Sequence, residues 1–353
     1  MTSRDITNLR LVNQQLTGSA FTTSAELVSW MGCIQSQEFA GAKWAIGNRL
    51  NGITDADIEN DFNAGKILRT HILRPTWHFV SPEDICWMLK LTAPRIKAMS
   101  KGIHRKLGIN DIILKRSKRI IAEALSGGKQ LTRDQLLPFF KENRINTDDI
   151  RLGFLLMDAE LDGLICSGAR LGKQFTYALL EERVLNRIQI NKEAALAELA
   201  KRYFLSRGPA TLQDFSWWSG LNLTQSKLAL ELNKSILINE VINGQAYWFS
   251  PSLKPANSKG LIKLLPAFDE YAISYKDRSD ILSQPSNKNA GNGIFKPIIV
   301  IDGKIQGTWT RSYLKRHVQL EILALDSSIR LLKQQLISAS ESYSRFLATE
   351  VNL

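Results

Sequence analysis

The sequence is poor in the residues that build disulfides and metal sites. Its three cysteines, Cys33, Cys86 and Cys166, are far apart, and no two of them form a CxxC pair. Isolated cysteines of this kind are typical of buried, reduced thiols in a cytoplasmic protein. The four histidines show no metal-ligand spacing such as HExxH, and there is no glycine-rich phosphate loop. We therefore expect neither a metal nor a cofactor.

Long apolar runs are missing as well. No stretch approaches the roughly 20 apolar residues that cross a bilayer. Residues 2–5 (TSRD) lead into an amphipathic helix and do not resemble the start of a signal peptide. No coiled-coil segment marks a dimerisation element. The sequence therefore predicts a cytoplasmic monomer with no membrane contact.

Acidic residues are outnumbered by basic ones. The chain has 46 Lys and Arg against 34 Asp and Glu, a formal charge of +12 and a pI of about 9.6. This balance favours a polyanionic partner, and nucleic acid is the first candidate. We therefore expect the protein to associate with the nucleoid.

The densest basic run lies between residues 95 and 119, where nine Lys or Arg face a single acid, Asp111. These residues are Arg95, Lys97, Lys101, Arg105, Lys106, Lys115, Arg116, Lys118 and Arg119. Such a density neutralises several phosphates and makes binding salt-dependent. The alternative is a solvated helix face with no ligand.

One supersecondary plan recurs three times along the chain. Each copy has a helix, a helix with a Ser or Thr cap, another helix and then a β-hairpin, which is the order of a winged helix-turn-helix. The copies span residues 1–90, 91–185 and 186–252. The second predicted hairpin turns at 168–173, and the third turns at Asn243-Gly244, a strong hairpin signal. Three successive matches are more specific than one.

Strand-like runs dominate after about residue 251. Runs at 261–265, 297–301 and 319–325 predict strands, with a turn at Asp302-Gly303, a polar loop at 283–293 and a final helix over 327–347. The predicted fold class is α+β, with three tandem winged-helix domains followed by a small β-barrel-like domain over 253–353.

The second helix of each helix-turn-helix pair is poorly suited to reading bases. The helix at 223–232 has one basic residue in its first part, and the helix at 152–161 is apolar and acidic. These units are expected to hold DNA by shape and by phosphate contacts, which argues against a sequence-specific regulator.

The stretch around Gln35-Ser36-Gln37 places two amides in an apolar, helical neighbourhood. Apolar residues lead into it from Ala25 to Met31 and out of it from Phe39 to Leu50. Leaving amides in such a place costs free energy unless they find partners. Read locally, the two glutamines are either solvated helix side chains or part of a functional site.

A basic hairpin is predicted over residues 300–311. It carries Lys304, Trp309 and Arg311 near an exposed turn, a combination suited to the minor groove of DNA. The alternative for Trp309 is a core position in the barrel.

The chain resembles the winged-helix DNA glycosylases of the AlkZ type, a family that includes enzymes that unhook azinomycin crosslinks and the YcaQ-like proteins. The resemblance covers nearly the whole chain. It rests on Gln35-Ser36-Gln37 and on residues 73–80 (LRPTWHFV), 265–271 (LPAFDEY) and 301–309 (IDGKIQGTW). Ser36 departs from the apolar residue that is usual between the two amides.

The resemblance implies a concave face for double-stranded DNA and hydrolysis of the N-glycosidic bond of cationic N-alkylpurines. It implies Gln35 and Gln37 as the catalytic pair. The expected DNA contacts are Arg74, His78, Arg95, Lys97, Lys101, Arg105, Lys106, Lys304, Trp309 and Arg311. For His78 the alternative is a satisfied structural histidine beside Trp77.

The chemistry is compatible with two amides. A cationic alkylpurine leaves readily, so the enzyme mainly orients a water and stabilises an oxocarbenium-like sugar. Full extrusion of a crosslinked base is difficult, so the resemblance implies access to the lesion without it. One difficulty is that side chains two residues apart on a helix point roughly 200° apart, so the pair requires a turn, a helix end or a distortion. Glu38 is the rival base.

Two other readings remain open. The same modules would build a non-catalytic DNA-binding protein, regulatory or architectural. A protein-interaction scaffold with a basic surface is the third possibility, and salt-dependent duplex binding would reject it.

Overall fold

The computed structural model describes residues 1–353 apart from 149, 257, 283–294 and 326–332. The polar loop predicted at 283–293 lies outside the described residues. Within the described part, no helix is long and apolar enough to span a membrane.

Residues 3–80 form four helices and a three-stranded sheet of order β1-β3-β2. Thr2, Thr23 and Thr54 each start a helix in a capping box, in which the threonine and an acid three residues later exchange hydrogen bonds with the backbone. The elements are α1 (Ser3–Asn13), α2 (Ser24–Met31), β1 (Ile34–Gln35), α3 (Phe39–Gly47), α4 (Asp55–Asn63), β2 (Leu68–Ile72) and β3 (Thr76–Val80).

The second unit begins with a long helix, which has Pro82 as its first residue and crosses the predicted boundary between residues 90 and 91. Thr132 caps the middle helix, and the turn predicted at 168–173 joins the last two strands of a sheet of order β4-β6-β5. The elements are α5 (Pro82–Lys106), α6 (Asp111–Leu125), β4 (Leu131–Thr132), α7 (Arg133–Glu142), α8 (Arg151–Leu161), β5 (Ile165–Ser167), β6 (Thr176–Leu179) and α9 (Leu180–Arg183).

The third unit has three helices followed by a β-hairpin. Its hairpin turns at Asn243 and Gly244, which both have positive φ, so the predicted Asn-Gly turn is confirmed. The elements are α10 (Lys192–Arg207), α11 (Leu212–Ser219), α12 (Leu223–Glu231), β7 (Ile238–Ile242) and β8 (Gln245–Phe249).

The C-terminal part is a five-stranded sheet of order β13-β12-β11-β10-β9, with a helix packed against it. The sheet forms a half-barrel with β9 and β13 at its two edges. The elements are β9 (Ile262–Leu265), α13 (Glu270–Ile273), β10 (Ile298–Ile301), β11 (Lys304–Tyr313), β12 (Val318–Ala324), α14 (Lys333–Leu347) and β13 (Val351–Asn352).

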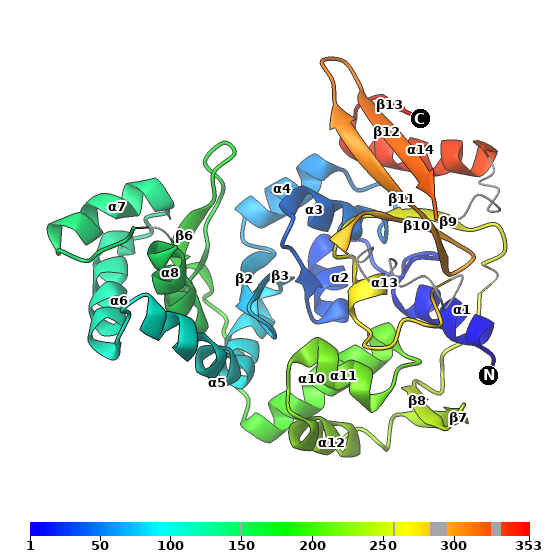
Figure 1. Cartoon of the computed structure of the whole chain (residues 1–353), viewed down its shortest axis with the longest axis horizontal. Helices are drawn as coiled ribbons and strands as arrows, with labels where there is room; N and C mark the ends of the chain where they lie inside the picture. The colour runs from blue at the N-terminus through cyan, green and yellow to red at the C-terminus, as the bar shows by residue number, and fades with distance from the viewer. Residues whose placement is uncertain (149, 257, 283–294, 326–332) are drawn as a thin grey trace.

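Figure 1 shows how these parts are arranged. Helices α6, α7 and α8 lie to the left of the view, and α5 joins them to the rest of the chain. The sheet that contains β2 and β3 lies at the centre, α10 to α12 lie below it, and the β11–β12 hairpin projects above.

The hydrophobic cores cross the predicted domain boundaries. Leu68 and Val80 of the first unit share a core with Leu199 and Phe215 of the third. A second core joins the first unit to the half-barrel and includes α3 and α14. Burial of apolar surface in these shared cores therefore fixes the first unit between the third unit and the half-barrel.

The structure corrects the prediction for the hairpin at 300–311. Trp309 is 1% exposed, its indole nitrogen donates to the Leu265 carbonyl at 2.9 Å, and its ring packs edge-on against Tyr343. A side chain covered in this way cannot contact DNA, so that expectation is wrong and the core alternative holds.

The turn predicted at Asp302-Gly303 does not project from the protein surface. Gly303 is buried and packs closely against α1. A Cβ added to Gly303 would lie only 2.8 Å from the Cβ of Thr7. The amine of Lys304 donates to the Asp280 carbonyl. The exposed hairpin turn is instead the next one, between β11 and β12, where Tyr313 and Leu314 are largely exposed.

We expect Trp309→Phe to lower the free energy of unfolding by about 1–3 kcal/mol, because it leaves the buried Leu265 carbonyl without this donor. Urea unfolding followed by circular dichroism measures the change. Trp217→Phe is the matched control, since Trp217 also donates to a backbone carbonyl, that of Ile273 at 3.2 Å, but is 44% exposed, so water can replace the lost donor. An equal effect of both substitutions would contradict this role of Trp309.

Candidate active site

The Gln35-Ser36-Gln37 motif is not helical. Helix α2 ends at Met31, and Gly32 (φ 71°) turns the chain into β1, where Gln35 pairs with His78 of β3. Gln35 is the last residue of β1, and Gln37 lies in the bend that follows. The motif therefore lies just after the end of a helix, which is one of the arrangements that the pair was expected to require. The 200° separation of a regular helix does not apply to it.

The two glutamines differ in exposure. Gln35 is 7% exposed and Ser36 is fully buried, whereas Gln37 is exposed. The motif thus runs from the core of the protein to its surface within three residues.

The side chain of Gln35 is held by Arg74. Arg74 Nη2 donates to Gln35 Oε1 at 3.1 Å. Because a guanidinium only donates, it fixes the amide with its oxygen toward Arg74. Burial lowers the pKa of Arg74, and the nearby Glu270 carboxylate acts in the opposite direction. Arg74, expected as a DNA contact, is in this structure a partner of the motif.

The backbone of Gln35 is held by Glu270. The Gln35 amide donates to Glu270 Oε1 at 2.8 Å, while Glu270 Oε2 accepts from Arg207 Nη2 at 2.8 Å, from Ser274 Oγ at 2.6 Å and from Trp218 Nε1 at 3.1 Å. Burial raises the pKa of Glu270, but Arg207 and the Ser274 hydrogen bond outweigh it and lower the pKa to about 2. Glu270 is therefore ionised at neutral pH.

Arg207 also holds the turn that leads into the motif. Its guanidinium donates to the carbonyls of Met31 at 2.6 Å and Cys33 at 3.0 Å. Both Arg207 and Glu270 are fully buried, so this ion pair clamps residues 31–35 from behind.

The other end of the motif is held by β3 and by Arg69. The Ser36 amide donates to the Trp77 carbonyl at 2.7 Å, and the Trp77 amide donates to Gln37 Oε1 at 3.3 Å. Arg69 donates twice to the Ser36 carbonyl and lies between the rings of Trp77 and Phe175, 4.1 and 4.5 Å from their centroids. Burial lowers the pKa of Arg69 to about 10. Arg69 and Trp77 also line a cavity of about 410 Å³ next to the second unit.

His78 lies beneath the motif and is fully buried. Its Nδ1 pairs with the Thr76 carbonyl at 2.9 Å, and its Nε2 has no partner among the described residues. Burial, followed by the positive charge of Arg74, lowers the pKa of His78 to about 3. The ring is neutral at physiological pH, and the expectation that it contacts DNA is wrong because its side chain is covered.

We expect His78 to make the protein less stable in mild acid. The unfolded chain takes up a proton near pH 6.5 and the folded chain only near pH 3, so the free energy of unfolding falls as pH drops between these values, by up to about 1.4 kcal/mol per pH unit. Urea midpoints at pH 7, 5 and 4 measure the fall. The slope is expected to be smaller in His78→Gln than in His317→Gln, and equal slopes would contradict this assignment.

Glu38 is poorly placed as a rival base. Its carboxylate caps α3 by accepting from the Gly41 amide at 2.7 Å, and it pairs with Arg311 Nη2 at 3.0 Å. Arg311 also donates to the Tyr343 hydroxyl at 3.1 Å. Both members of this pair thus already have partners within the protein.

Some cations of the basic run between residues 95 and 119 already form ion pairs within the protein. Lys97 and Lys118 both form ion pairs with Asp158 and Asp162 of the second unit, so they stabilise the contact between α5, α6 and α8. Arg95, Lys101, Arg105 and Lys106 are exposed on the second half of α5. The structure thus joins Arg74 and His78 to the glutamines and places the free cations on a different element.

Sequence reasoning missed Glu270, Arg207 and Arg69 as parts of the site. Glu270 falls inside the family-like stretch 265–271, so that signal was present. No local pattern marks Arg207 or Arg69. Among the described residues, no cluster of His, Cys, Asp and Glu is suited to hold a metal ion.

The comparisons with known proteins show the family and the fold. Residues 28–346 match the family described as "DNA glycosylase AlkZ-like". The chain is 22% identical over 324 residues to an "interstrand DNA cross-link repair glycosylase" of Streptomyces sahachiroi, with 87% of each chain covered. The solved structure of Streptomyces sahachiroi DNA glycosylase AlkZ has the same fold, with a TM-score of 0.81 at 19% identity over 100% of this chain and 99% of that one.

Proposed function

Since this chain belongs to the AlkZ-like DNA glycosylase family, we propose that it hydrolyses the N-glycosidic bond of cationic alkylated purines in double-stranded DNA. The substrates are N7- and N3-alkylpurines. By analogy with the crosslink-repair relative, they include interstrand crosslinks. The enzyme is monofunctional and acts as a monomer in the cytoplasm.

The observation that carries this proposal is the geometry of the two glutamines. Gln35 at the end of β1 and Gln37 in the bend after it lie two residues apart outside any helix, and Arg74 and Glu270 fix Gln35. Amide oxygens that are held in place orient a water and present partial negative charge to an oxocarbenium-like sugar. The alkylated base leaves as a neutral molecule because it already carries a positive charge, so no strong acid is required.

We propose that DNA is held mainly through its phosphates. The exposed cations of α5 supply part of this contact, and the three helix-rich units act as winged helices that bind by shape. The exposed turn between β11 and β12 carries Tyr313, Leu314, Lys315 and Arg316, a combination of apolar and basic side chains that suits a groove. This turn replaces the one predicted at Asp302-Gly303.

The function is tested by incubating the protein with a duplex that contains one N7-methylguanine, and separately with a nitrogen-mustard interstrand crosslink. We expect abasic sites with the first substrate and strand separation on a denaturing gel with the second. Intact duplex binding without release of any base would instead support the non-catalytic alternative. Release from the first substrate alone would restrict the activity to monoadducts.

Arg74 is expected to act through Gln35. Arg74→Leu removes the donor that orients the amide, and we expect the single-turnover rate of base release to fall about 10- to 100-fold. Arg74→Lys keeps a donor and is expected to restore part of the rate. The control Lys101→Leu changes an exposed cation on α5, so it is expected to weaken DNA binding and leave the bound rate unchanged. The reverse pattern would make Arg74 a plain DNA contact.

A further inference from the structure

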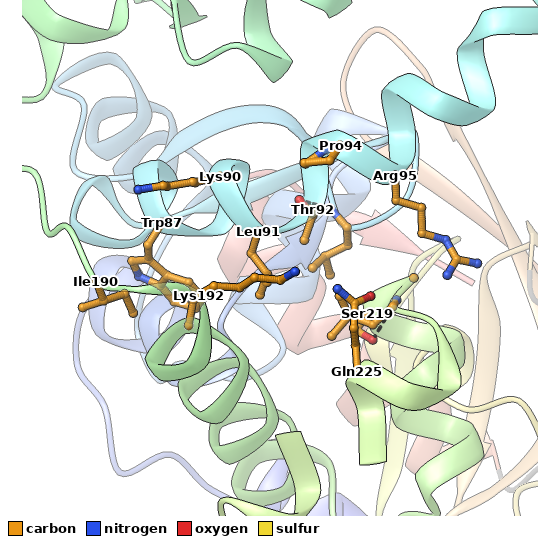
Figure 2. Close-up of a pocket in the computed structure, with 14 residues that line it drawn as sticks. Trp87, Lys90, Leu91, Thr92, Pro94, Arg95, Ile190, Lys192, Ser219 and Gln225 are labelled. Atoms are coloured by element: carbon orange, nitrogen blue, oxygen red, sulfur yellow. Dashed lines mark hydrogen bonds between the residues drawn. The ribbon is translucent and has the colours of Figure 1, made fainter. Parts of the chain in front are cut away.

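A second pocket lies between α5, the start of α10 and the turn that joins α11 to α12 (Figure 2). Its volume is about 420 Å³, within the usual range for small-molecule sites. The inner wall is formed by buried apolar side chains from α5 and α10 and from the turns between β2 and β3 and between α11 and α12. They are Leu73, Trp87, Leu91, Ala195 and Leu221.

The rim of this pocket is cationic. Lys90 and Arg95 extend from α5 and Lys192 from the first turn of α10 (Figure 2), and no acidic residue lines the pocket. All three cations are exposed, and none has an ion-pair or hydrogen-bond partner among the described residues. Lys192 is also the first residue of α10, where the helix dipole disfavours a cation. Helix stability therefore does not account for its position.

The side-chain amide of Gln225 lines the pocket and has hydrogen-bonding capacity that the described residues do not fill. The hydroxyls of Thr92 and Ser219 donate to the carbonyls of Met88 and Phe215. The Gln225 amide oxygen accepts only from the Asn222 amide at 3.4 Å, and its NH₂ group has no partner in the described part of the chain. A ligand with both a donor and an acceptor on one edge would satisfy this amide.

We propose that this pocket binds a nucleotide that is not base-paired. The planar base lies against the apolar wall that includes Trp87, the Gln225 amide pairs with the base edge, and Arg95 and Lys192 lie near the phosphate. A simple aliphatic anion would satisfy the cations but leave the amide unpaired. The nucleotide comes either from solution or from an unpaired position in a DNA strand.

The pocket is connected to the motif through the β2–β3 turn. Leu73, which lines the pocket, has a φ of 61° and directly precedes Arg74, the partner of Gln35. The turn at Gly220 packs so closely on Leu73 that an added Cβ would lie 2.6 Å from the Leu73 carbonyl oxygen. An unpaired nucleotide of a bound strand would therefore be held one residue away from the side chain that positions Gln35.

Fluorescence of 2-aminopurine tests this site independently of catalysis. The first probe is free 2-aminopurine deoxynucleoside 5′-monophosphate, and the second is a duplex with one unpaired 2-aminopurine. We expect at least one probe to bind, and the double variant Arg95→Glu/Lys192→Glu to raise its Kd at least tenfold. Which probe responds identifies the source of the nucleotide. Lys227→Glu, an exposed substitution on α12 outside this pocket, is the control.

Two further measurements separate this site from general attraction of DNA to positive charge. Gln225→Leu keeps every cation, and we expect it to weaken binding of the unpaired nucleotide but not of a fully paired duplex. Decanoate tests the aliphatic alternative. Failure of both probes to bind, equal losses with Lys227→Glu, or binding of decanoate alone would overturn the proposal. None of these measurements depends on base release. Failure of this proposal can therefore be distinguished from failure of the proposed glycosylase activity.

Discussion

Replacing Glu270 with alanine is expected to lower the free energy of unfolding by about 3–5 kcal/mol, because it leaves the Arg207 charge buried without its partner. It also removes the acceptor for the Gln35 amide and for the Trp218 indole. Domains of this kind are stable by roughly 5–15 kcal/mol, so this is a large share of the total. Urea unfolding followed by circular dichroism measures it.

Two variants sharpen this test. Glu341→Ala removes an exposed carboxylate on α14 and is expected to change stability by less than about 0.5 kcal/mol. Glu270→Gln keeps the shape and an acceptor but not the charge. Its loss of unfolding free energy is therefore expected to lie between those of Glu270→Ala and Glu341→Ala. A midpoint for Glu270→Ala equal to that of Glu341→Ala would contradict the role of the pair.

The same pair adds to the acid sensitivity of the protein. The folded-state pKa of Glu270 is about 2, below its ordinary value of 4.5. Its contribution to stability is therefore complete above about pH 4.5 and is lost as pH falls toward 2. Between about pH 6.5 and 4.5 only the His78 effect is expected, whereas both effects are expected between about pH 4.5 and 3, so the upper part of a pH series isolates His78.

The second large effect is expected at the glutamines. Gln35→Ala is expected to lower the single-turnover rate of base release by about 10²–10³-fold, the usual cost of removing one preorganised hydrogen-bonding group from an active site. Duplex affinity is expected to change little, because the amide carries no charge. Gln37→Ala is expected to act on the same step, and the double variant to cost less than the product of the two single effects.

The control for these variants is Gln213→Ala, which removes an exposed amide from α11. Circular dichroism melts of all four proteins establish that the fold is intact. A double variant that retains its rate within a few-fold would remove the motif from the mechanism. Glu38 would then be the next candidate.

The elements that the sequence predicted well are those with local causes. The threonine caps, the Asn243-Gly244 turn and the hairpin at 164–179 depend on residues within a few positions of each other. Trp309 also carried a local signal, because Ile305, Gly307 and Trp309 alternate along β11 and all three are buried. That alternation favours the core position over the DNA contact.

The conformation of the motif had one local signal, Gly32 just before it. The chain leaves the helix ahead of Gln35 because Gly32 ends α2 and because Arg207, more than 170 residues away in the sequence, binds the carbonyls of Met31 and Cys33. The apolar residues on both sides of the motif favoured a helix. The strand at residues 34–35 also depends on its pairing with β3, which no local pattern predicts.

The most direct test of the proposed chemistry is a product analysis under single-turnover conditions. Wild-type protein in excess is incubated with a duplex that carries one N7-methylguanine, and the free base, the abasic strand and any borohydride-trapped complex are measured. The proposed mechanism predicts free 7-methylguanine, an uncut abasic strand and no trapped complex, with release lost in Gln35→Ala. Trapping of a covalent complex, cleavage of the strand, or undiminished release by the variant would contradict it.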